Sequence, residues 1–167
     1  MTKKTLSKLV LLLLISITLQ PCLLKHQLIA QPADEDGLQA AEKESLQKAK
    51  DPEEQFKIYL EIASGRLKDL LSACSKQEKE AAGRAALGFR TAVSGADDCV
   101  ANAQAKSKNT KKLTTTLSKA VKKYNFSLIL ALEKAPEDFR KYIQSAFEVS
   151  ARVGEGIRIQ LEHQVKK

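Results

Sequence analysis

Residues 51–74, DPEEQFKIYLEIASGRLKDLLSAC, predict the fold because they combine a clear helix start with a regular apolar pattern. Asp51 is suited to accept hydrogen bonds from the first backbone N–H groups, and Pro52 fits the first helical position. Glu53 and Glu54 complement the positive end of the helix dipole. Apolar residues then recur at intervals of 4, 3, 4, 3 and 4, namely Phe56, Leu60, Ala63, Leu67, Leu70 and Cys74. This spacing predicts a long amphipathic helix with one face toward a neighbour.

Three further helices are expected from the same kinds of signal. The same intervals recur downstream, through Ala85, Phe89, Ala92, Ala96, Cys99 and Ala103. After a cap at Asn109-Thr110, a third apolar face comprises Leu113, Leu117, Ala120, Val121, Tyr124, Leu128 and Leu132. A proline and two acids at 136–138 begin a fourth helix, whose face comprises Phe139, Tyr142, Ile143, Ala146, Val153, Ile157 and Leu161. We therefore expect an all-α fold, an antiparallel helical bundle or paired helical hairpins with about four to five helices.

Two details of these helices remain open in the sequence. Gly88 and Gly95 each weaken the second helix by roughly 1 kcal/mol relative to alanine, so either is a candidate for a bend or turn. Residues 126–132, FSLILAL, are apolar nearly all round, which indicates a deeply buried helix or a brief strand. The flanking residues favour the helix.

The sequence after Cys74 gives conflicting signals about where the chain turns. Residues 75–78, SKQE, match a capping box that would begin a new helix just past Cys74, although the pattern also occurs inside helices. A disulfide between Cys74 and Cys99, expected in an oxidising compartment, needs a turn between Gly83 and Gly88 instead. The alternative interpretation treats both cysteines as small residues that fill the apolar faces.

The N-terminal residues have the pattern of an export signal. Lys3, Lys4 and Lys8 precede the largely apolar run Leu9–Leu19, which is shorter than the roughly 18–20 residues of a membrane span. We expect residues 1–30 to be a cleaved signal peptide and the protein to be periplasmic or secreted. An uncleaved membrane anchor, or a lipoprotein lipidated at Cys22, is the alternative.

The remaining chain divides into two parts by composition. Residues 31–50 are acidic and polar, which indicates a flexible lead-in followed by a weak helix, and residues 51–167 form the helical domain. The formal net charge is +8, and four lysines with no acid lie in residues 1–30, so the rest carries +4. That charge is segregated, with −4 in residues 31–70 and +7 in residues 101–134.

The basic segment is a candidate contact for an anionic surface. Its lysines fall largely off the apolar face of the third helix, and they are Lys106, Lys108, Lys111, Lys112, Lys119, Lys122 and Lys123. Lysines suit diffuse attraction to anions better than bidentate recognition. Behind an export signal, lipid head groups, cell-wall polymers or an acidic protein partner are within reach, which argues against nucleic acid. The alternative interpretation is a solvated helix face without a partner, whose positive charge is balanced by the acidic residues 31–70.

Motifs for catalysis or cofactor binding are not found in the sequence. Of the two histidines, His26 would leave with the signal and His163 lies near the C-terminal end. Asp97 and Asp98 are better explained as helix-capping residues after Gly95 than as a catalytic pair. We expect no metal site, no cofactor and no enzymatic activity. A thiol-dependent enzyme that uses Cys74 or Cys99 is the third class of function after the two below.

The predicted function is an exported binding or scaffolding protein, with an electrostatic binder of anionic envelope surfaces as the alternative. The oligomeric state stays open because such apolar faces serve a bundle core or a dimer seam equally well.

Overall fold

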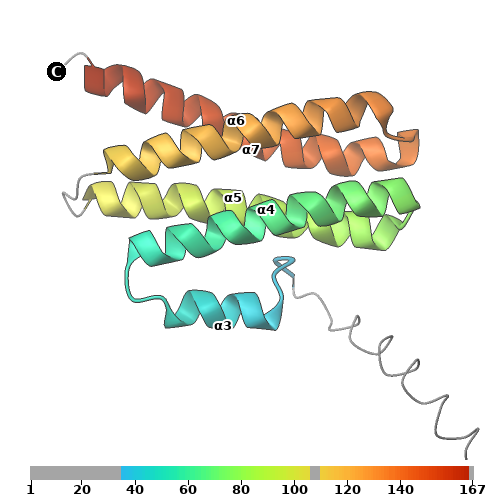
Figure 1. Cartoon of the computed structure of the whole chain (residues 1–167), viewed down its shortest axis with the longest axis horizontal. Helices are drawn as coiled ribbons and strands as arrows, with labels where there is room; N and C mark the ends of the chain where they lie inside the picture. The colour runs from blue at the N-terminus through green and yellow to red at the C-terminus, as the bar shows by residue number, and fades with distance from the viewer. Residues whose placement is uncertain (1–34, 106–109, 166–167) are drawn as a thin grey trace, which may run out of the picture. The chain divides into compact units, whose positions relative to one another are not determined.

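The computed structural model describes residues 35–105 and 110–165, with side chains up to residue 162, and these residues belong to one compact unit. They form five helices and no strand, so the all-α prediction is confirmed (Figure 1). The helices are α3 (Ala40–Lys48), α4 (Pro52–Lys76), α5 (Lys79–Ala105), α6 (Lys111–Lys134) and α7 (Glu137–Val165). Predictions that concern residues 1–34 and 106–109, including the signal peptide, lie outside the described residues.

Helices α4 and α5 form an antiparallel hairpin that begins at the predicted position and turns at one of the two places that the sequence left open. The Asp51 carboxylate accepts hydrogen bonds from the backbone N–H groups of Glu53 and Glu54, at 2.9 and 3.0 Å, so the predicted cap is confirmed. The chain turns just past Cys74, where Gln77 adopts a left-handed conformation with φ 59°. The Gln77 and Glu78 N–H groups donate to carbonyl oxygens in the last turn of α4, which is a helix C-terminal motif.

The capping box expected at residues 75–78 is not the device that makes this turn. Ser75 lies within α4, and its hydroxyl donates to the Ser72 carbonyl oxygen at 2.8 Å. Helix α5 then continues through Gly88 and Gly95 without the bend or turn that those glycines suggested. Gly95 instead leaves room for the neighbouring helix, because a Cβ atom there would lie 2.5 Å from the ring of Tyr59 on α4.

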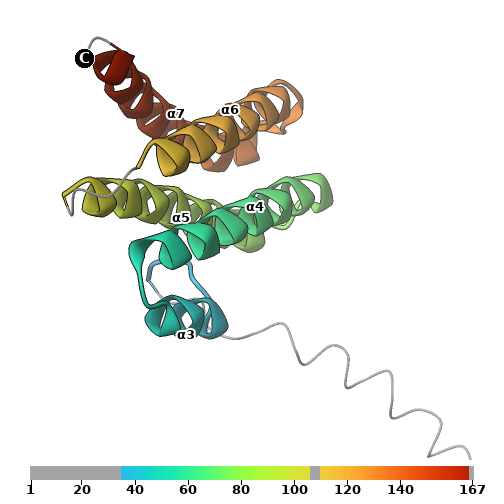
Figure 2. The ribbon, with the colours of Figure 1, turned by 60° about the vertical axis from the view of Figure 1, so that its left-hand side comes forward.

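Helices α6 and α7 form a second hairpin, and the two hairpins pack into one bundle. Helix α5 packs against α4 on one side and α7 on another, α7 packs against α6, and α4 makes a smaller contact with α6 (Figures 1 and 2). The Tyr124 ring of α6 meets Phe89 of α5 edge-on, with centroids 5.4 Å apart, and its hydroxyl donates to Leu60 O at 3.3 Å. The fold therefore combines the two predicted arrangements: it is an antiparallel helical bundle built from two helical hairpins that share one core.

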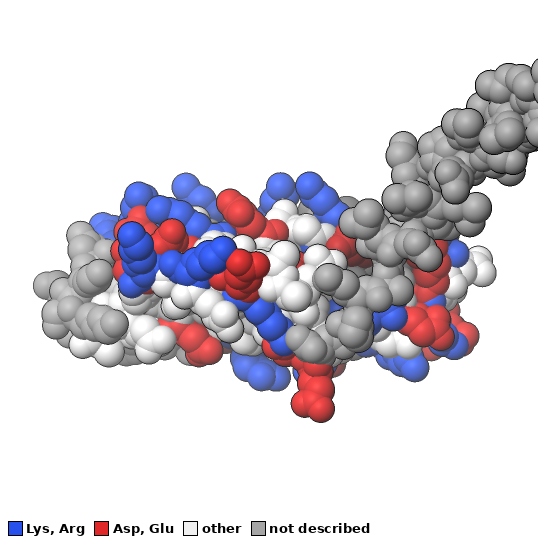
Figure 3. Space-filling view, turned by 90° about the horizontal axis from the view of Figure 1, so that it is seen from below, with Lys and Arg blue, Asp and Glu red and all other residues white. Residues whose placement is uncertain are grey.

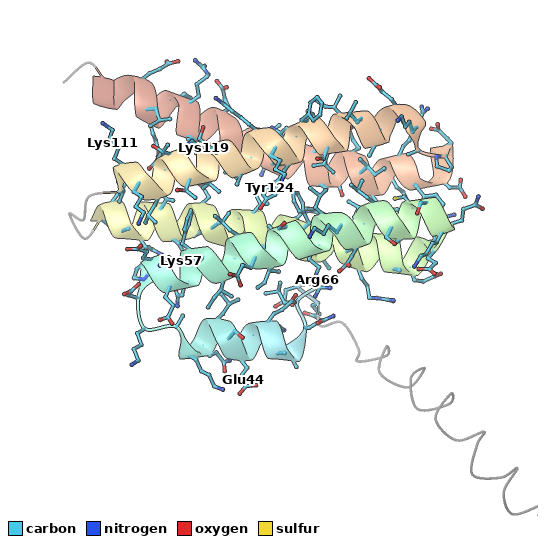
Figure 4. The ribbon with its side chains drawn as sticks, in the orientation of Figure 1. Glu44, Lys57, Arg66, Lys111, Lys119 and Tyr124 are labelled. Carbon is cyan, nitrogen blue, oxygen red and sulfur yellow. The ribbon has the colours of Figure 1, made fainter. Side chains whose placement is uncertain are left out.

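Residues 35–48 pack against the first hairpin, which the polar composition of this segment did not predict. Leu38 is 4% exposed, and the Thr91 hydroxyl of α5 donates to Asp36 O at 2.8 Å. The buried Arg66 of α4 donates from Nη2 to Glu42 Oε2 of α3 at 2.6 Å. Figure 4 shows Arg66 on the side of α4 that faces α3. Helix α3 is thus attached to the bundle by apolar burial and by a largely buried ion pair.

Candidate functional site

The predicted lysines that the structure describes lie along the exposed side of α6. Lys106 and Lys108 lie outside the described residues, whereas Lys111 and Lys112 begin the helix (Figure 4). Lys112 lies 3.9 Å from Glu53 of α4. Three further lysines make no ion pair with another described residue, and they are Lys119, Lys122 and Lys123. Helix α6 holds six lysines and one glutamate, so it is a concentrated source of positive charge.

The C-terminal half of α6 exposes apolar side chains on the same side of the helix. Phe126 is 66% exposed, Ile129 44% and Leu130 40%, whereas Leu128 is fully buried. Residues 126–132 are helical, as the flanking residues predicted, and do not form a strand. The expectation that this segment is deeply buried is wrong for much of it. The cause is position in the bundle, because only one side of α6 meets α4, α5 and α7.

The basic and apolar residues share a single outward face, which we call the outward stripe. Its members are all exposed and recur at intervals of 4, 3, 4, 3 and 4, and they are Lys112, Thr116, Lys119, Lys123, Phe126 and Leu130. This spacing keeps them on one side of the helix, opposite the buried face. The outward stripe is basic and polar over its N-terminal part and apolar at its C-terminal end. Lys122 and Ile129 lie beside it.

The face that carries α3 differs from the outward stripe in its charge pattern. Figure 3 shows acidic and basic side chains interspersed over this face. Ion pairs here include Lys43 with Asp36 at 3.1 Å and Lys48 with Glu44 at 2.6 Å. Unlike Lys119 and Lys123, these lysines are neutralised by nearby carboxylates within the chain.

A groove of about 800 Å³ lies between α6 and the C-terminal part of α7, where the two helices diverge (Figure 2). Its residues on α6 include Val121, Lys122 and Asn125, and Gly154 and Arg158 line it from α7. A Cβ atom at Gly154 would lie 3.0 Å from Val121, so this glycine permits the close approach of the helices below the groove.

The polar groups of the groove are largely engaged with one another. Arg158 donates to both carboxylate oxygens of Glu155, at 3.0 and 2.6 Å, and also to Glu162. These hydrogen bonds lower the pKa of the Glu155 carboxyl below its ordinary value. Asn125 Oδ1 is buried without a hydrogen-bond partner among the residues that the structure describes. The sequence pattern did not predict this groove, because it depends on the divergence of α7 from α6.

Cys74 and Cys99 are free and buried, so the expected disulfide between them is not formed. The turn at Gln77 places Cys74 beside the hairpin loop, whereas Cys99 lies 20 residues into α5 after Lys79, about 30 Å along the helix. Burial raises the pKa of both thiols, and burial together with the nearby Asp98 raises that of Cys99 to about 11. Both side chains therefore act as small core residues, the alternative that the apolar spacing allowed.

We expect both thiols to react slowly in the folded protein. A pKa of about 11 instead of 9.0 lowers the thiolate fraction of Cys99 at pH 8 about a hundredfold, and burial limits access further. Labelling with an aromatic disulfide reagent, followed by absorbance, should be slow in buffer and fast in denaturant. Rapid labelling in buffer at pH 8 would contradict this prediction.

The raised pKa also makes the folding stability depend on pH. The contribution of Cys99 to the free energy of unfolding is complete below pH 9 and falls as the pH rises toward 11, since the pKa of the thiol is higher in the folded state than in the unfolded state.

The acidic pair in α5 does not occupy the predicted capping position. Asp97 and Asp98 lie inside α5 rather than at a helix start, because α5 is continuous through Gly95. Burial, and to a smaller extent the charge of Asp98, raises the pKa of Asp97. Within the described part of the chain, no group of three or more histidine, cysteine, aspartate or glutamate residues is placed to hold a metal ion. The side chain of His163 lies outside that part.

Helices α3 to α7, over the residues that the structure describes, include none with the length and hydropathy of a membrane span. Comparison of the chain with protein-family models, with curated proteins and with solved structures finds no match.

Proposed function

We propose that this protein is an exported helical binding or scaffolding protein that acts through helix faces, and chiefly through the outward stripe of α6. The observation that supports the proposal is the exposure of Phe126, Ile129 and Leu130 in continuity with Lys119 and Lys123. Scattered single apolar residues are normal on a protein surface, whereas apolar residues grouped on one helix face are a feature of interaction sites. The raised pKa values of both cysteines favour a binding role over thiol chemistry.

Retention of the purified chain on an envelope fraction of the producing cells tests this proposal. The double variant Phe126→Ser, Leu130→Ser should reduce retention at least about tenfold, because it removes most of the exposed apolar surface. Ile159→Ser is the matched control, since Ile159 is 45% exposed but lies on α7. Equal retention of the wild type and the double variant would contradict a binding role for the apolar part of the outward stripe.

The second candidate is a purely electrostatic binder of anionic envelope surfaces through the lysines of residues 106–123. It is supported by Lys119, Lys122 and Lys123, which make no ion pair with another described residue. Raising the salt concentration shortens the screening length, so this candidate predicts retention that disappears in high salt and does not depend on Phe126. Retention that resists salt would exclude it.

A further inference from the structure

We infer that the outward stripe binds the surface of an anionic lipid bilayer, with α6 lying along the membrane plane. This inference rests on the proposed function and names the partner of the same surface. The charge of α6 is complementary to a phosphate-bearing surface, with six lysines and a single glutamate in the helix. Lysine-rich faces are attracted to anionic head groups without needing a fixed geometry.

The apolar part of the outward stripe supplies the second contact that stable binding requires. Phe126 and Leu130 project outward from the convex surface of a helix, at 66% and 40% exposure. Aromatic and aliphatic side chains in this position can enter the boundary between head groups and acyl chains, while lysines of the same helix remain among the phosphates. From Lys112 to Leu130 the outward stripe extends about 27 Å along α6, so all of it can meet one flat surface at once.

The same features argue against two other partners for this helix face, a second copy of the chain and an acidic protein. A second copy joined through a helical seam would need apolar residues along the whole outward stripe, whereas three of its six positions are lysines. An acidic protein bound at a defined site would be expected to use the bidentate geometry of arginine, and α6 contains no arginine. The groove between α6 and α7 borders this surface at Lys122, and its residues Glu155 and Glu162 already pair with Arg158.

Binding of the full chain to vesicles of phosphatidylcholine, with and without phosphatidylglycerol, tests the inference by co-sedimentation. The wild type should bind the anionic vesicles and not those of phosphatidylcholine alone. The triple variant Lys119→Gln, Lys122→Gln, Lys123→Gln should lower the partition coefficient roughly a hundredfold, since each lysine near such a surface contributes about fivefold. The double variant Phe126→Ser, Leu130→Ser should lower it at least about tenfold.

Matched controls separate α6 from the rest of the chain. Lys50→Gln, Lys68→Gln, Lys76→Gln makes the same change in net charge at exposed positions outside α6, and Ile159→Ser removes an exposed apolar side chain from α7. Both controls should bind anionic vesicles as the wild type does. Every variant carries the same residues 1–34, so differences among them report on the substituted positions. Circular dichroism checks that each variant is folded.

The outcomes distinguish the inference from the proposed function. Equal binding by α6 variants and controls, or equal binding to both kinds of vesicle, overturns the lipid inference. If α6 variants nevertheless lose retention on the envelope fraction, the partner is a protein or polymer and the proposed function stands. If the α6 variants change neither vesicle binding nor retention on the envelope fraction, both the lipid inference and the proposed function are wrong. A dimer in light scattering that Phe126→Ser, Leu130→Ser dissociates assigns the surface to a second copy and also overturns the lipid inference.

Discussion

Replacing Gly88 with alanine is expected to destabilise the folded chain by about 2 kcal/mol, although alanine is the better helix former. Gly88 is buried in α5 where residues 36–38 cross that helix. A Cβ atom at Gly88 would lie 2.6 Å from Gly37 O and 3.0 Å from Arg66 Nε. A backbone carbonyl cannot rotate away as a flexible side chain can. The segment before α3 would therefore have to move off α5.

Urea denaturation compared with a matched glycine variant measures this effect. Gly65→Ala is the control, because Gly65 lies exposed in α4 and an added Cβ atom there would have nothing within 4 Å. It should stabilise the chain by about 0.5–1 kcal/mol through helix preference alone. Hydrogen exchange of the α3 amides should become faster in Gly88→Ala and not in Gly65→Ala. A stabilising effect of Gly88→Ala would show that residues 36–38 do not restrict this position.

The main helices of this chain could be predicted because their signals are local. The Asp51-Pro52 start of α4 depends on residues within one helical turn, and the apolar intervals define its buried face without knowledge of the partner. The position of the first turn stayed open, because a capping box indicated a turn just past Cys74 and a disulfide needed one between Gly83 and Gly88. The chain turns at Gln77 through a helix C-terminal motif, since capping-box residues also occur inside helices. The burial of Cys74 and Cys99 followed from their places on the apolar faces, whereas their pairing depended on where the chain turned.

The attachment of residues 35–48 and the apolar half of the outward stripe could not be predicted in the same way. Glu42 and Arg66 are 24 residues apart, and neither belongs to an apolar face, so no local pattern relates them. In residues 126–132 the apolar side chains outnumber the positions that neighbouring helices can cover. A signal was nevertheless present, because Phe126 and Leu130 continue the interval pattern of Lys119 and Lys123.

Removing the carboxylate of Glu42 is expected to destabilise the chain by about 2–3 kcal/mol, more than the loss of a surface ion pair. The Arg66 side chain is only 10% exposed and that of Glu42 21%, with the pair 2.6 Å apart. Glu42 Oε2 also accepts the Gln39 backbone N–H at 2.6 Å, so the same oxygen holds the start of α3. Asp69, 3.7 Å from Arg66 and 63% exposed, is poorly placed to replace it. Glu42→Ala thus leaves a nearly buried guanidinium whose Nε already lacks a hydrogen-bond partner in the described part of the chain.

A double-mutant cycle measured by urea denaturation separates this buried charge from the other contacts of α3. Arg66→Met keeps a long apolar side chain and removes the charge, so adding it to Glu42→Ala should recover part of the lost stability. Glu44→Ala is the control for carboxylate removal, because Glu44 pairs with Lys48 at the same 2.6 Å but the two side chains are 64% and 74% exposed (Figure 4). Solvent screens that pair, so its loss should leave the unfolding midpoint unchanged. Equal effects of Glu42→Ala and Glu44→Ala would mean that apolar burial alone, chiefly that of Leu38, holds α3 on the bundle.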